Sequence, residues 1–285
     1  ASSCNQVVTV VDNAAPAITC PGEATVNCSS APGSAECFGD ILSAIISTDS
    51  SATGSATASD NCDNDIDIDF SDSVEAGSCA QEKTITRTWT ATDGCGNSSA
   101  CTQTITVVDN TAPVITCPAN ATVNCEDDST SAATGAATGT DNCDADVTVT
   151  ESDSVAAGSC SQEEVITRTW SATDDCGNSS SCDQIVTVVD DEAPVIACPD
   201  DMTIECSPDI TEAGCLADLL DTAVNTDTVG TGAATATDNC DSAPAISQSS
   251  GFTAGSCPQE KVITRAWTAT DACGNSSSCN QVITV

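Results

Sequence analysis

Apolar and polar residues alternate along much of this chain, and the alternation predicts β-strands. In the segments Ile85–Ala91 and Thr104–Val108, apolar side chains alternate with Thr between stretches of Gly, Asn, Asp and Ser. A period of two is typical of antiparallel strands with one buried face. The run of residues 94–99 between the two segments predicts a hairpin. By the same period, one face of the first segment carries Ile85, Arg87, Trp89 and Ala91.

The pattern returns three times, which predicts three modules. The segment 87–99, with Trp followed by Ala-Thr-Asp and then Cys-Gly-Asn-Ser-Ser, recurs at 168–180 and 265–277. Other landmarks keep the same order: Cys-Pro, a second Cys eight residues later, Asp-Asn-Cys-Asp, and Ala-Gly-Ser-Cys. A fixed order of landmarks is the signature of a tandem array.

The opening residues 3–10 match the closing residues 278–285, so we expect the chain to start with the last strand of a preceding module. The predicted domains are 1–12 for that strand and 13–109, 110–190 and 191–285 for the three modules. The joints between them are short and end in proline, at Pro16, Pro113 and Pro194. Because proline restricts the backbone, we expect stiff joints.

Short strands in small repeats predict an all-β fold of tandem immunoglobulin-like β-sandwich modules. Each module has a single tryptophan on the buried face of its hairpin. We therefore expect Trp89, Trp170 and Trp267 to form the cores.

Two insertions interrupt the strand pattern, in the first and third modules. Apolar residues follow Cys37 and Cys215 at helical spacing, which predicts a short amphipathic helix in each. One interpretation is that helix and cysteine form a contact between modules or chains. The other is that the helix packs on its own sandwich and its cysteine joins a rearranged internal set.

Composition places the chain outside the cell. Its 21 cysteines occur without any histidine, so disulfides fit better than zinc sites. The 43 acidic and five basic residues give a net charge of −38, which disfavours nucleic acid and anionic membranes as partners. No apolar run is long enough to insert into a membrane. We predict an extracellular protein, secreted or on a cell surface.

The joint sequence Val-Val-Asp-Asn-Thr-Ala-Pro-Val-Ile-Thr-Cys-Pro at 107–118, preceded by Ala-Thr-Asp-x-Cys-Gly-Asn, resembles the hyalin-repeat (HYR) family. The resemblance implies immunoglobulin-like modules of extracellular adhesion and matrix proteins. The amino-acid sequence around each Trp most resembles repeat arrays in very large secreted surface proteins of Bacteroidota-type bacteria. The chain departs from the simplest family pattern because it has six or seven cysteines per module instead of one pair.

We expect most cysteines to form disulfides inside the modules. In the second module the resemblance implies Cys117 with Cys182, and proximity favours Cys143 with Cys160, which leaves Cys125 with Cys176; a bridge from Cys176 to Cys182 is an alternative. The expected internal set is Cys20, Cys28, Cys62, Cys79, Cys95, Cys101, Cys117, Cys125, Cys143, Cys160, Cys176, Cys182, Cys198, Cys206, Cys240, Cys257, Cys273 and Cys279. Cys4, Cys37 and Cys215 are left over as candidates for intermodule or interchain bridges.

Aspartates recur at the joints and turns, and they are candidate Ca²⁺ ligands. If the turns lie at the joint end of each module, carboxylates from two modules gather there. The alternative is that these side chains only cap turns. The candidates are Asp12, Asp60, Asp93, Asp109, Asp141, Asp174, Asp190, Asp238 and Asp271.

No catalytic constellation is evident, since there is no His and no Gly-x-Ser-x-Gly motif. We do not expect an enzyme. The chain is predicted to be a structural repeat of an extracellular fibre or a long adhesin shaft, with copies of itself or neighbouring modules as partners. The alternative is an extracellular module that binds a glycan, a mineral or a protein.

Overall fold

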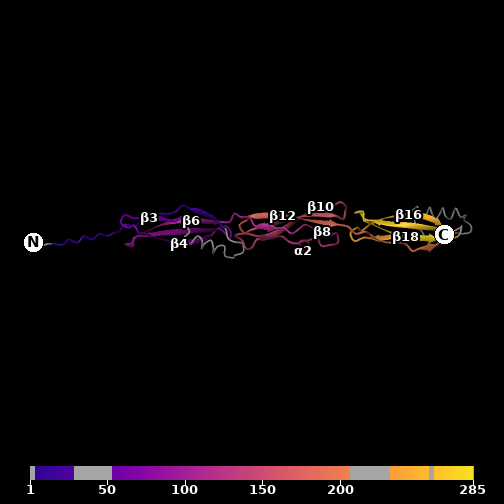
Figure 1. Ribbon diagram of the computed structural model, residues 1–285, viewed down its shortest axis with the longest axis horizontal. Coiled ribbons are helices and arrows are strands. Elements are labelled where there is room, and N and C mark those ends of the chain that lie inside the picture. The colour runs from indigo at the N-terminus through magenta and orange to yellow at the C-terminus, as the bar shows by residue number, and fades with distance from the viewer. Residues whose placement is uncertain (1–3, 29–52, 206–231, 257–259, 285) are drawn as a thin grey trace. The chain divides into compact units, whose positions relative to one another are not determined.

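The computed structural model describes residues 4–28, 53–205, 232–256 and 260–284, and within them the fold is all-β, as predicted. Three sets of strands follow one another in the same order (Figure 1). The first set is β1 (Ala17–Thr19), β2 (Ala24–Asn27), β3 (Thr57–Ser59), β4 (Asp67–Ala76), β5 (Lys83–Thr92) and β6 (Ser98–Val108). We call these sets repeats 1, 2 and 3.

The other two repeats have the same layout. Repeat 2 contains β7 (Val114–Thr116), β8 (Ala121–Asn124), β9 (Thr138–Thr140), β10 (Thr148–Ala157), β11 (Glu164–Thr173) and β12 (Ser179–Val189). Repeat 3 contains β13 (Val195–Ala197), β14 (Met202–Thr203), β15 (Thr235–Thr237), β16 (Ala245–Ala254), β17 (Lys261–Thr270) and β18 (Ser276–Thr284).

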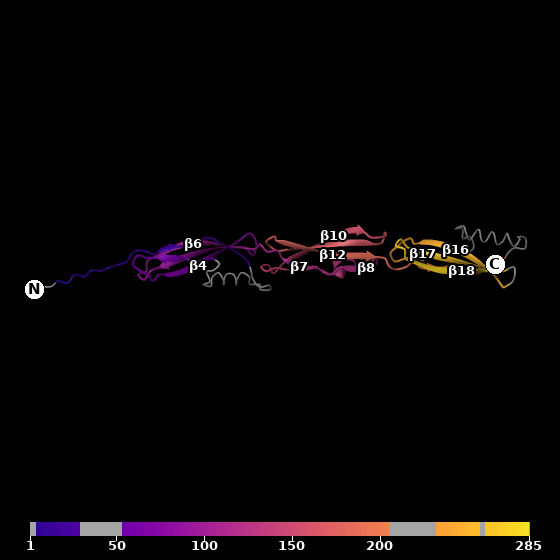
Figure 2. The same cartoon turned by 45° about the horizontal axis from the view of Figure 1, so that its top comes forward.

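Each repeat is built from a four-stranded and a two-stranded sheet. In repeat 1 the orders are β2-β6-β5-β4 and β1-β3, and the other repeats follow the same order. The long strands pair antiparallel, whereas β2 runs parallel to β6. The chain therefore enters in one sheet and crosses to the other, which gives the two layers of a sandwich (Figure 2).

The alternation of side chains along each long strand determines which residues form the core. Along β5 the residues Ile85, Arg87, Trp89 and Ala91 are buried and share one face, as predicted. The tryptophans Trp89, Trp170 and Trp267 are 5–7% exposed, which confirms the predicted cores.

The chain divides into two compact units, one made of 1–117, 137–151 and 170–182, and the other of 118–136, 152–169 and 183–285. The first unit holds the joint at residues 109–113, and the second holds the joint at 190–194. Each joint therefore lies within one compact body.

The only helix in the described part of the chain is α2 (Ser131–Thr134), a single turn in repeat 2. The two predicted amphipathic helices, with Cys37 and Cys215, fall outside the described residues. No helix that the structure describes is long and apolar enough to span a membrane.

Candidate functional site at the joints between repeats

The Asp-Asn-Cys-Asp motif folds into a turn that its first aspartate caps. Asp141 Oδ1 accepts hydrogen bonds from the backbone N–H of Cys143 at 2.8 Å and of Asp144 at 3.0 Å. Asp60 and Asp238 make the same pair of bonds in their repeats. This confirms that the aspartates cap turns, and it leaves their second oxygen for another role.

A second turn, in the hairpin after the tryptophan strand, is capped in the same way. Asp93 Oδ1 accepts from the N–H of Cys95 at 3.0 Å and of Asn97 at 2.8 Å. Gly96 has a φ of 90°, a conformation that favours glycine. Asn97 also donates to the backbone oxygen of Asp12 at 3.3 Å, so the turn contacts the joint directly.

One hydrogen bond ties the two turns together in every repeat. The Asp63 carboxylate accepts from Gly94 N at 2.6 Å. Asp144 accepts from Asp175 N at 2.8 Å, and Asp241 accepts from Ala272 N at 3.0 Å. The cysteines of the two turns therefore lie at the same end of the repeat, at the joint with the preceding one.

The remaining two cysteine motifs lie at the opposite end. Cys28 follows β2 and its N–H donates to Val108 O at 2.7 Å, at the end of β6. The Ala-Gly-Ser-Cys motif forms a loop closed by Gly77 N donating to Glu82 O at 2.8 Å and by hydrogen bonds from Ser78 to the Glu82 carboxylate. Cys79 is thus presented at the end of β4 that faces the next repeat.

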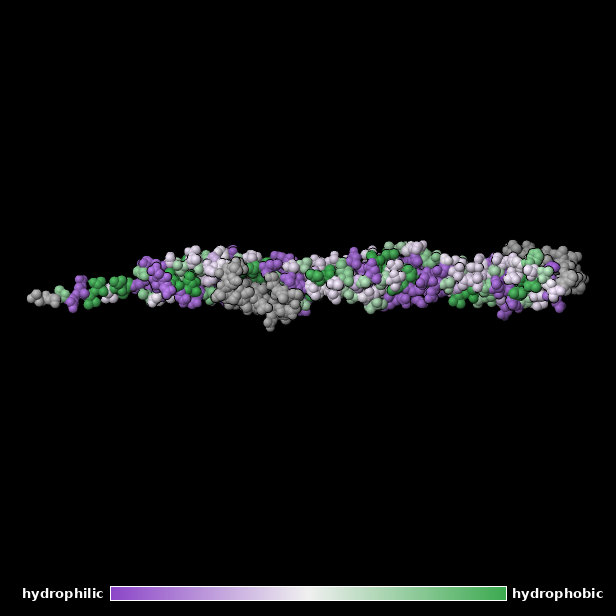
Figure 3. All heavy atoms as spheres, viewed as in Figure 1, coloured by the Kyte–Doolittle hydropathy of each residue, from purple (hydrophilic) through white to green (hydrophobic). Residues whose placement is uncertain are grey.

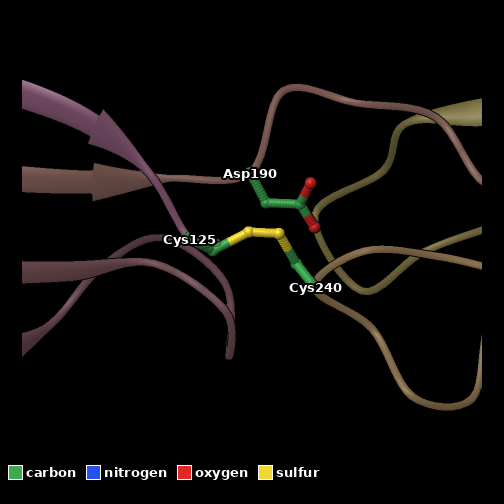
Figure 4. A group of neighbouring side chains, drawn as sticks. All are labelled: Cys125, Asp190 and Cys240. Carbon is green, nitrogen blue, oxygen red and sulfur yellow. A yellow bond between two sulfur atoms is a disulfide. The ribbon is translucent and has the colours of Figure 1, made fainter. Parts of the chain in front are cut away.

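As a result, two disulfides cross each joint between described repeats, namely the first joint at residues 109–113 and the second joint at residues 190–194. The first joint is crossed by Cys28–Cys143 and Cys79–Cys176, with Cα–Cα distances of 5.8 and 5.1 Å. The second is crossed by Cys125–Cys240 (Figure 4) and by Cys160–Cys273, with Cα–Cα distances of 5.9 and 5.1 Å. These separations suit a disulfide bond. Cys28 and Cys143 are also buried together with Ile85, Ile105 and Val107, so the core of repeat 1 extends into the joint.

The predicted internal pairing is therefore wrong for eight cysteines. Cys143 does not bond Cys160, nor Cys125 Cys176, nor Cys176 Cys182. The physical reason is strand length, since an extended strand of ten residues such as β10 spans about 33 Å. The cysteines before and after it meet neighbouring repeats instead, and the eight are Cys28, Cys79, Cys125, Cys143, Cys160, Cys176, Cys240 and Cys273.

One disulfide does lie inside each repeat, between its first and last strands. Cys117 bonds Cys182, as the family resemblance implied. Cys20–Cys101 and Cys198–Cys279 are its counterparts in the other repeats.

The structure contradicts the expected bridges at two further positions. Among the residues that it describes, Cys4, Cys62 and Cys95 are free and exposed, although Cys62 and Cys95 were expected to bond inside repeat 1. Cys62 and Cys95 occupy the turns whose counterparts in repeats 2 and 3 form disulfides with the preceding repeat. Cys37, Cys206, Cys215 and Cys257 lie outside the described residues, so the expectations for them stay predictions.

Carboxylates converge at the second joint. One oxygen from each of Asp190, Asp238 and Asp271 lies within 4.8 Å of the others. Asp190 and Asp271 are 4% and 6% exposed. Within the described chain, the buried atoms Asp190 Oδ1 and Oδ2, Asp238 Oδ2 and Asp271 Oδ2 have no hydrogen-bond partner. Three carboxylates this close, two of them buried and that of Asp238 half-buried, repel one another unless a proton or a cation is present.

The first joint repeats part of this arrangement. Oxygens of Asp109 and Asp141 come within 4.8 Å of each other beside Cys143, and Asp109 Oδ2 and Asp141 Oδ2 lack partners among the described residues. Asp12 and Asp60 form the equivalent pair beside the free Cys62. The structure thus brings the predicted joint and turn aspartates together three times.

Two predicted ligands are used differently. The second carboxylate oxygen of Asp93 accepts a hydrogen bond from the side-chain amide of Asn97 at 2.8 Å, and that of Asp174 accepts one from Asn178 at 2.9 Å. Hydrogen bonds from Asn97 hold the pKa of Asp93 below its usual value. The capping interpretation accounts for these two. Asn275 donates to the backbone oxygen of Asp190, as Asn97 and Asn178 do at their joints. In the described part of repeat 3, however, Asp271 Oδ2 has no hydrogen-bond partner.

The closeness of these carboxylates shifts pKa values at the joints. Burial, and then repulsion by Asp238 and Asp271, raises the pKa of Asp190. Burial likewise raises the pKa of Asp109, with further contributions from Asp141 and Asp174. Repulsion by Asp12, then burial and Asp60, raises the pKa of the Cys62 thiol.

The available donor atoms favour a hard cation. The sulfur atoms nearest Asp190 belong to the Cys125–Cys240 disulfide, so they are not thiolate ligands (Figure 4). What remains are carboxylate oxygens, the ligands that Ca²⁺ prefers, and not the set that zinc selects. The residues therefore fit a calcium ion, which would be held by Asp190, Asp238 and Asp271.

Sequence reasoning missed a buried glutamine that connects the last strand of each repeat to the segments between its short strands. Gln103, Gln184 and Gln281 are at most 2% exposed. Gln184 Nε2 donates to the backbone oxygens of Ala119 and Thr134 at 3.0 and 2.9 Å, and Gln281 donates to Asp200 O at 2.9 Å. The signal was present in the recurring Gln two residues after the last cysteine of each repeat.

Comparisons with known proteins identify the domain family of these repeats. The model of the HYR-like domain with 4 cysteines matches residues 36–107 and 113–188, more than half of the chain. No curated protein matches the chain.

Solved structures with some similarity are cadherin ectodomains. Drosophila N-cadherin EC1-4 shares 13% identity over 96% of this chain and 76% of its own, with a TM-score of 0.30. Mouse cadherin-23 EC22-24 shares 12% identity over 94% of this chain and 98% of its own, with a TM-score of 0.31. At such scores they carry no argument about this chain.

Proposed function

Because the chain belongs to the family of HYR-like domains with four cysteines, we propose that it is a structural segment of an extracellular fibre or adhesin shaft. The dense disulfides and the family indicate an extracellular domain. The observation that carries the proposal is the joint, where two disulfides and a carboxylate cluster connect consecutive repeats. An array built to hold its repeats in register needs this, whereas independent binding modules do not.

The covalent part of each joint limits how one repeat moves against the next. A single bond allows rotation about itself, but two bridges at separate points remove that freedom. Hydrogen bonds add to them, since Asn142 Nδ2 donates to Cys28 O at 2.7 Å and Asn27 Nδ2 to Thr111 Oγ1 at 3.3 Å. We infer that the joints are stiff and that stiffness is the property the array supplies.

Calcium is the second part of the proposal. With three carboxylates so close, two of them buried and one half-buried, each like-charged pair costs on the order of 4 kcal/mol at 4 Å and an effective dielectric constant near 20. A bound Ca²⁺ reverses the sign of that interaction. The joint would then be more stable at neutral pH with the ion present than without it, as suits an extracellular protein.

The disulfides are tested by mapping them in the non-reduced, alkylated chain by mass spectrometry. We expect peptides that join Cys28 to Cys143 and Cys125 to Cys240. Peptides that join Cys143 to Cys160 instead would contradict the proposal, because the repeats would then be independent.

Stiffness is tested by small-angle X-ray scattering of the oxidised chain and of the double variant Cys79→Ser, Cys176→Ser. This variant keeps the bridge inside each repeat and one bridge across the joint. We expect the variant to show a broader distribution of interatomic distances, and an unchanged distribution would argue against a stiffening role.

The sequence of the repeats resembles bacterial surface proteins, and an origin of the array in such a protein stays a prediction. So do the module boundaries at residues 12, 109 and 190 and a bridging role of Cys37 and Cys215.

A further inference from the structure

The segment Cys4–Val11 has the sequence of a buried strand but is exposed. From the cysteine onward it aligns without a gap with the last strands of the repeats, with Gln6, Val8 and Val10 at the positions of Gln103, Ile105 and Val107. Those three are at most 2% exposed in β6. In contrast Val8 and Val10 are 73% and 89% exposed, and hydrophobic spheres mark this segment beside the N-terminus in Figure 3.

The turns with Cys62 and Cys95 already have the geometry of their disulfide-bonded counterparts. The caps from Asp60 and Asp93 and the link from Gly94 N to Asp63 match those around Cys143 and Cys176, where both cysteines are bonded. The free turns therefore need no rearrangement of their own hydrogen bonds to form bridges.

We propose that Cys4–Val11, Cys62 and Cys95 together form a docking surface for one further repeat of the same kind, which supplies everything except its last strand. This inference rests on the proposed array and names the partner of its first repeat. The segment would fill the position that β6 occupies between β2 and β5. Cys62 and Cys95 would form the same two bridges as Cys143 and Cys176.

The chemistry of the surface selects this partner. Alternate apolar residues and a glutamine fit the interior of a sandwich, where the glutamine finds backbone oxygens as Gln184 does. The three thiols match three cysteines of a repeat, at the positions of Cys117, Cys125 and Cys160 in repeat 2. A second copy of this chain in its present fold does not fit, because β18 already fills that position in repeat 3.

The covalent step needs an oxidant, and a small-molecule disulfide such as oxidised glutathione supplies it. Each bridge forms when one thiolate attacks a mixed disulfide on the other cysteine and releases reduced glutathione. Three bridges consume three molecules of oxidised glutathione and yield six of the thiol. The six protein thiols give up six electrons and six protons in total.

The test extends the full chain by a copy of residues 110–178 placed directly before Ala1. This copy is repeat 2 without its last strand, and the fusion keeps the spacing from Asn178 to the next cysteine, with Ala1, Ser2 and Ser3 in place of residues 179–181. After oxidation in a glutathione buffer, we expect Cys4, Cys62 and Cys95 to resist alkylation. Peptide mapping should join them to the copies of Cys117, Cys125 and Cys160, respectively.

Alkylation of Cys62 and Cys95 in the extended chain, or a bond between these two, would overturn the inference. The array itself would still stand if Cys28–Cys143 and Cys125–Cys240 remained intact in the same sample, so the two failures are distinguishable.

A matched substitution guards against a misfolded extension. Val8→Asp changes an exposed residue in the original chain, so its melting temperature should not change. In the extended chain the same change places a carboxylate in a core, and the melting temperature of the added repeat should fall. An equal response in both chains would contradict docking of the segment.

Discussion

At the scale of single residues, a buried ion pair joins Arg87 of β5 to Asp72 of β4 in repeat 1. The guanidinium is 2% exposed and donates to both oxygens of Asp72, with Nε–Oδ1 at 2.9 Å and Nη2–Oδ2 at 2.8 Å. It also lies over the ring of Phe70, 4.1 Å from the centroid. Arg168 and Asp153 form the same fork in repeat 2.

Replacing Asp72 with Ala should destabilise repeat 1 by roughly 3–5 kcal/mol, because it leaves a buried charge without its partner. Urea unfolding followed by tryptophan fluorescence measures the change. Asp69→Ala on an exposed position of the same strand is the control, and it should cost little. Equal effects of the two substitutions would show that the ion pair contributes nothing specific.

The carboxylate cluster predicts how stability depends on pH and calcium. The folded-state pKa of Asp190 lies above the unfolded value of about 3.9, so the folded state binds the proton more tightly. When a chelator removes calcium, the contribution of Asp190 to the free energy of unfolding should therefore decrease as the pH rises from about 4 through its folded-state pKa. Calcium should restore the loss at neutral pH, as measured by differential scanning calorimetry.

Asp190→Asn should separate these effects. Without calcium it removes one of three repelling charges and should raise the melting temperature, and with calcium it should lose the gain that the wild type shows. Glu164→Gln on the exposed end of β11 is the charge-matched control. A calcium response that survives Asp190→Asn would place the ion elsewhere.

At the scale of elements, strands and hairpins could be predicted because a period of two shows directly in the sequence. The buried face of β5 came from that period alone. The joint bridges could not be predicted in this way, because a disulfide depends on which strand ends lie together in space. The separations do not reveal them either, since Cys79–Cys176 spans 97 residues and its counterpart Cys160–Cys273 spans 113.

The loop before β5 should tolerate no side chain at Gly77. A Cβ there would lie 2.4 Å from Glu82 Cβ, inside the loop that presents Cys79 to Cys176. We expect Gly77→Ala to destabilise the loop by about 1–3 kcal/mol through overpacking and to leave Cys176 open to alkylation. Gly22→Ala is the control, because its Cβ would meet nothing within 4 Å. Identical alkylation of the two variants would contradict this.

At the scale of the whole molecule, the joints should couple the unfolding of neighbouring repeats. In a linear array, cooperativity comes from the interfaces between repeats. The variant with Cys28, Cys79, Cys143 and Cys176 all changed to Ser retains the bridge inside each repeat. We expect its calorimetric transition to broaden or split, whereas the wild type should unfold over a narrower range. An unchanged transition would mean that the bridges do not couple the repeats.

The bridge inside each repeat gives the array a second property, which concerns tension. Cys20–Cys101, Cys117–Cys182 and Cys198–Cys279 connect the first strand of each repeat to its last, so a pull on the two ends bypasses the residues between them. In repeat 1 the two bonded cysteines are 81 positions apart in the sequence, and the chain between them would add about 270–290 Å of contour length if it were released. Stretched between two surfaces, the oxidised chain should yield none of this hidden length, and a reductant should turn the same tether into one that lengthens stepwise under load.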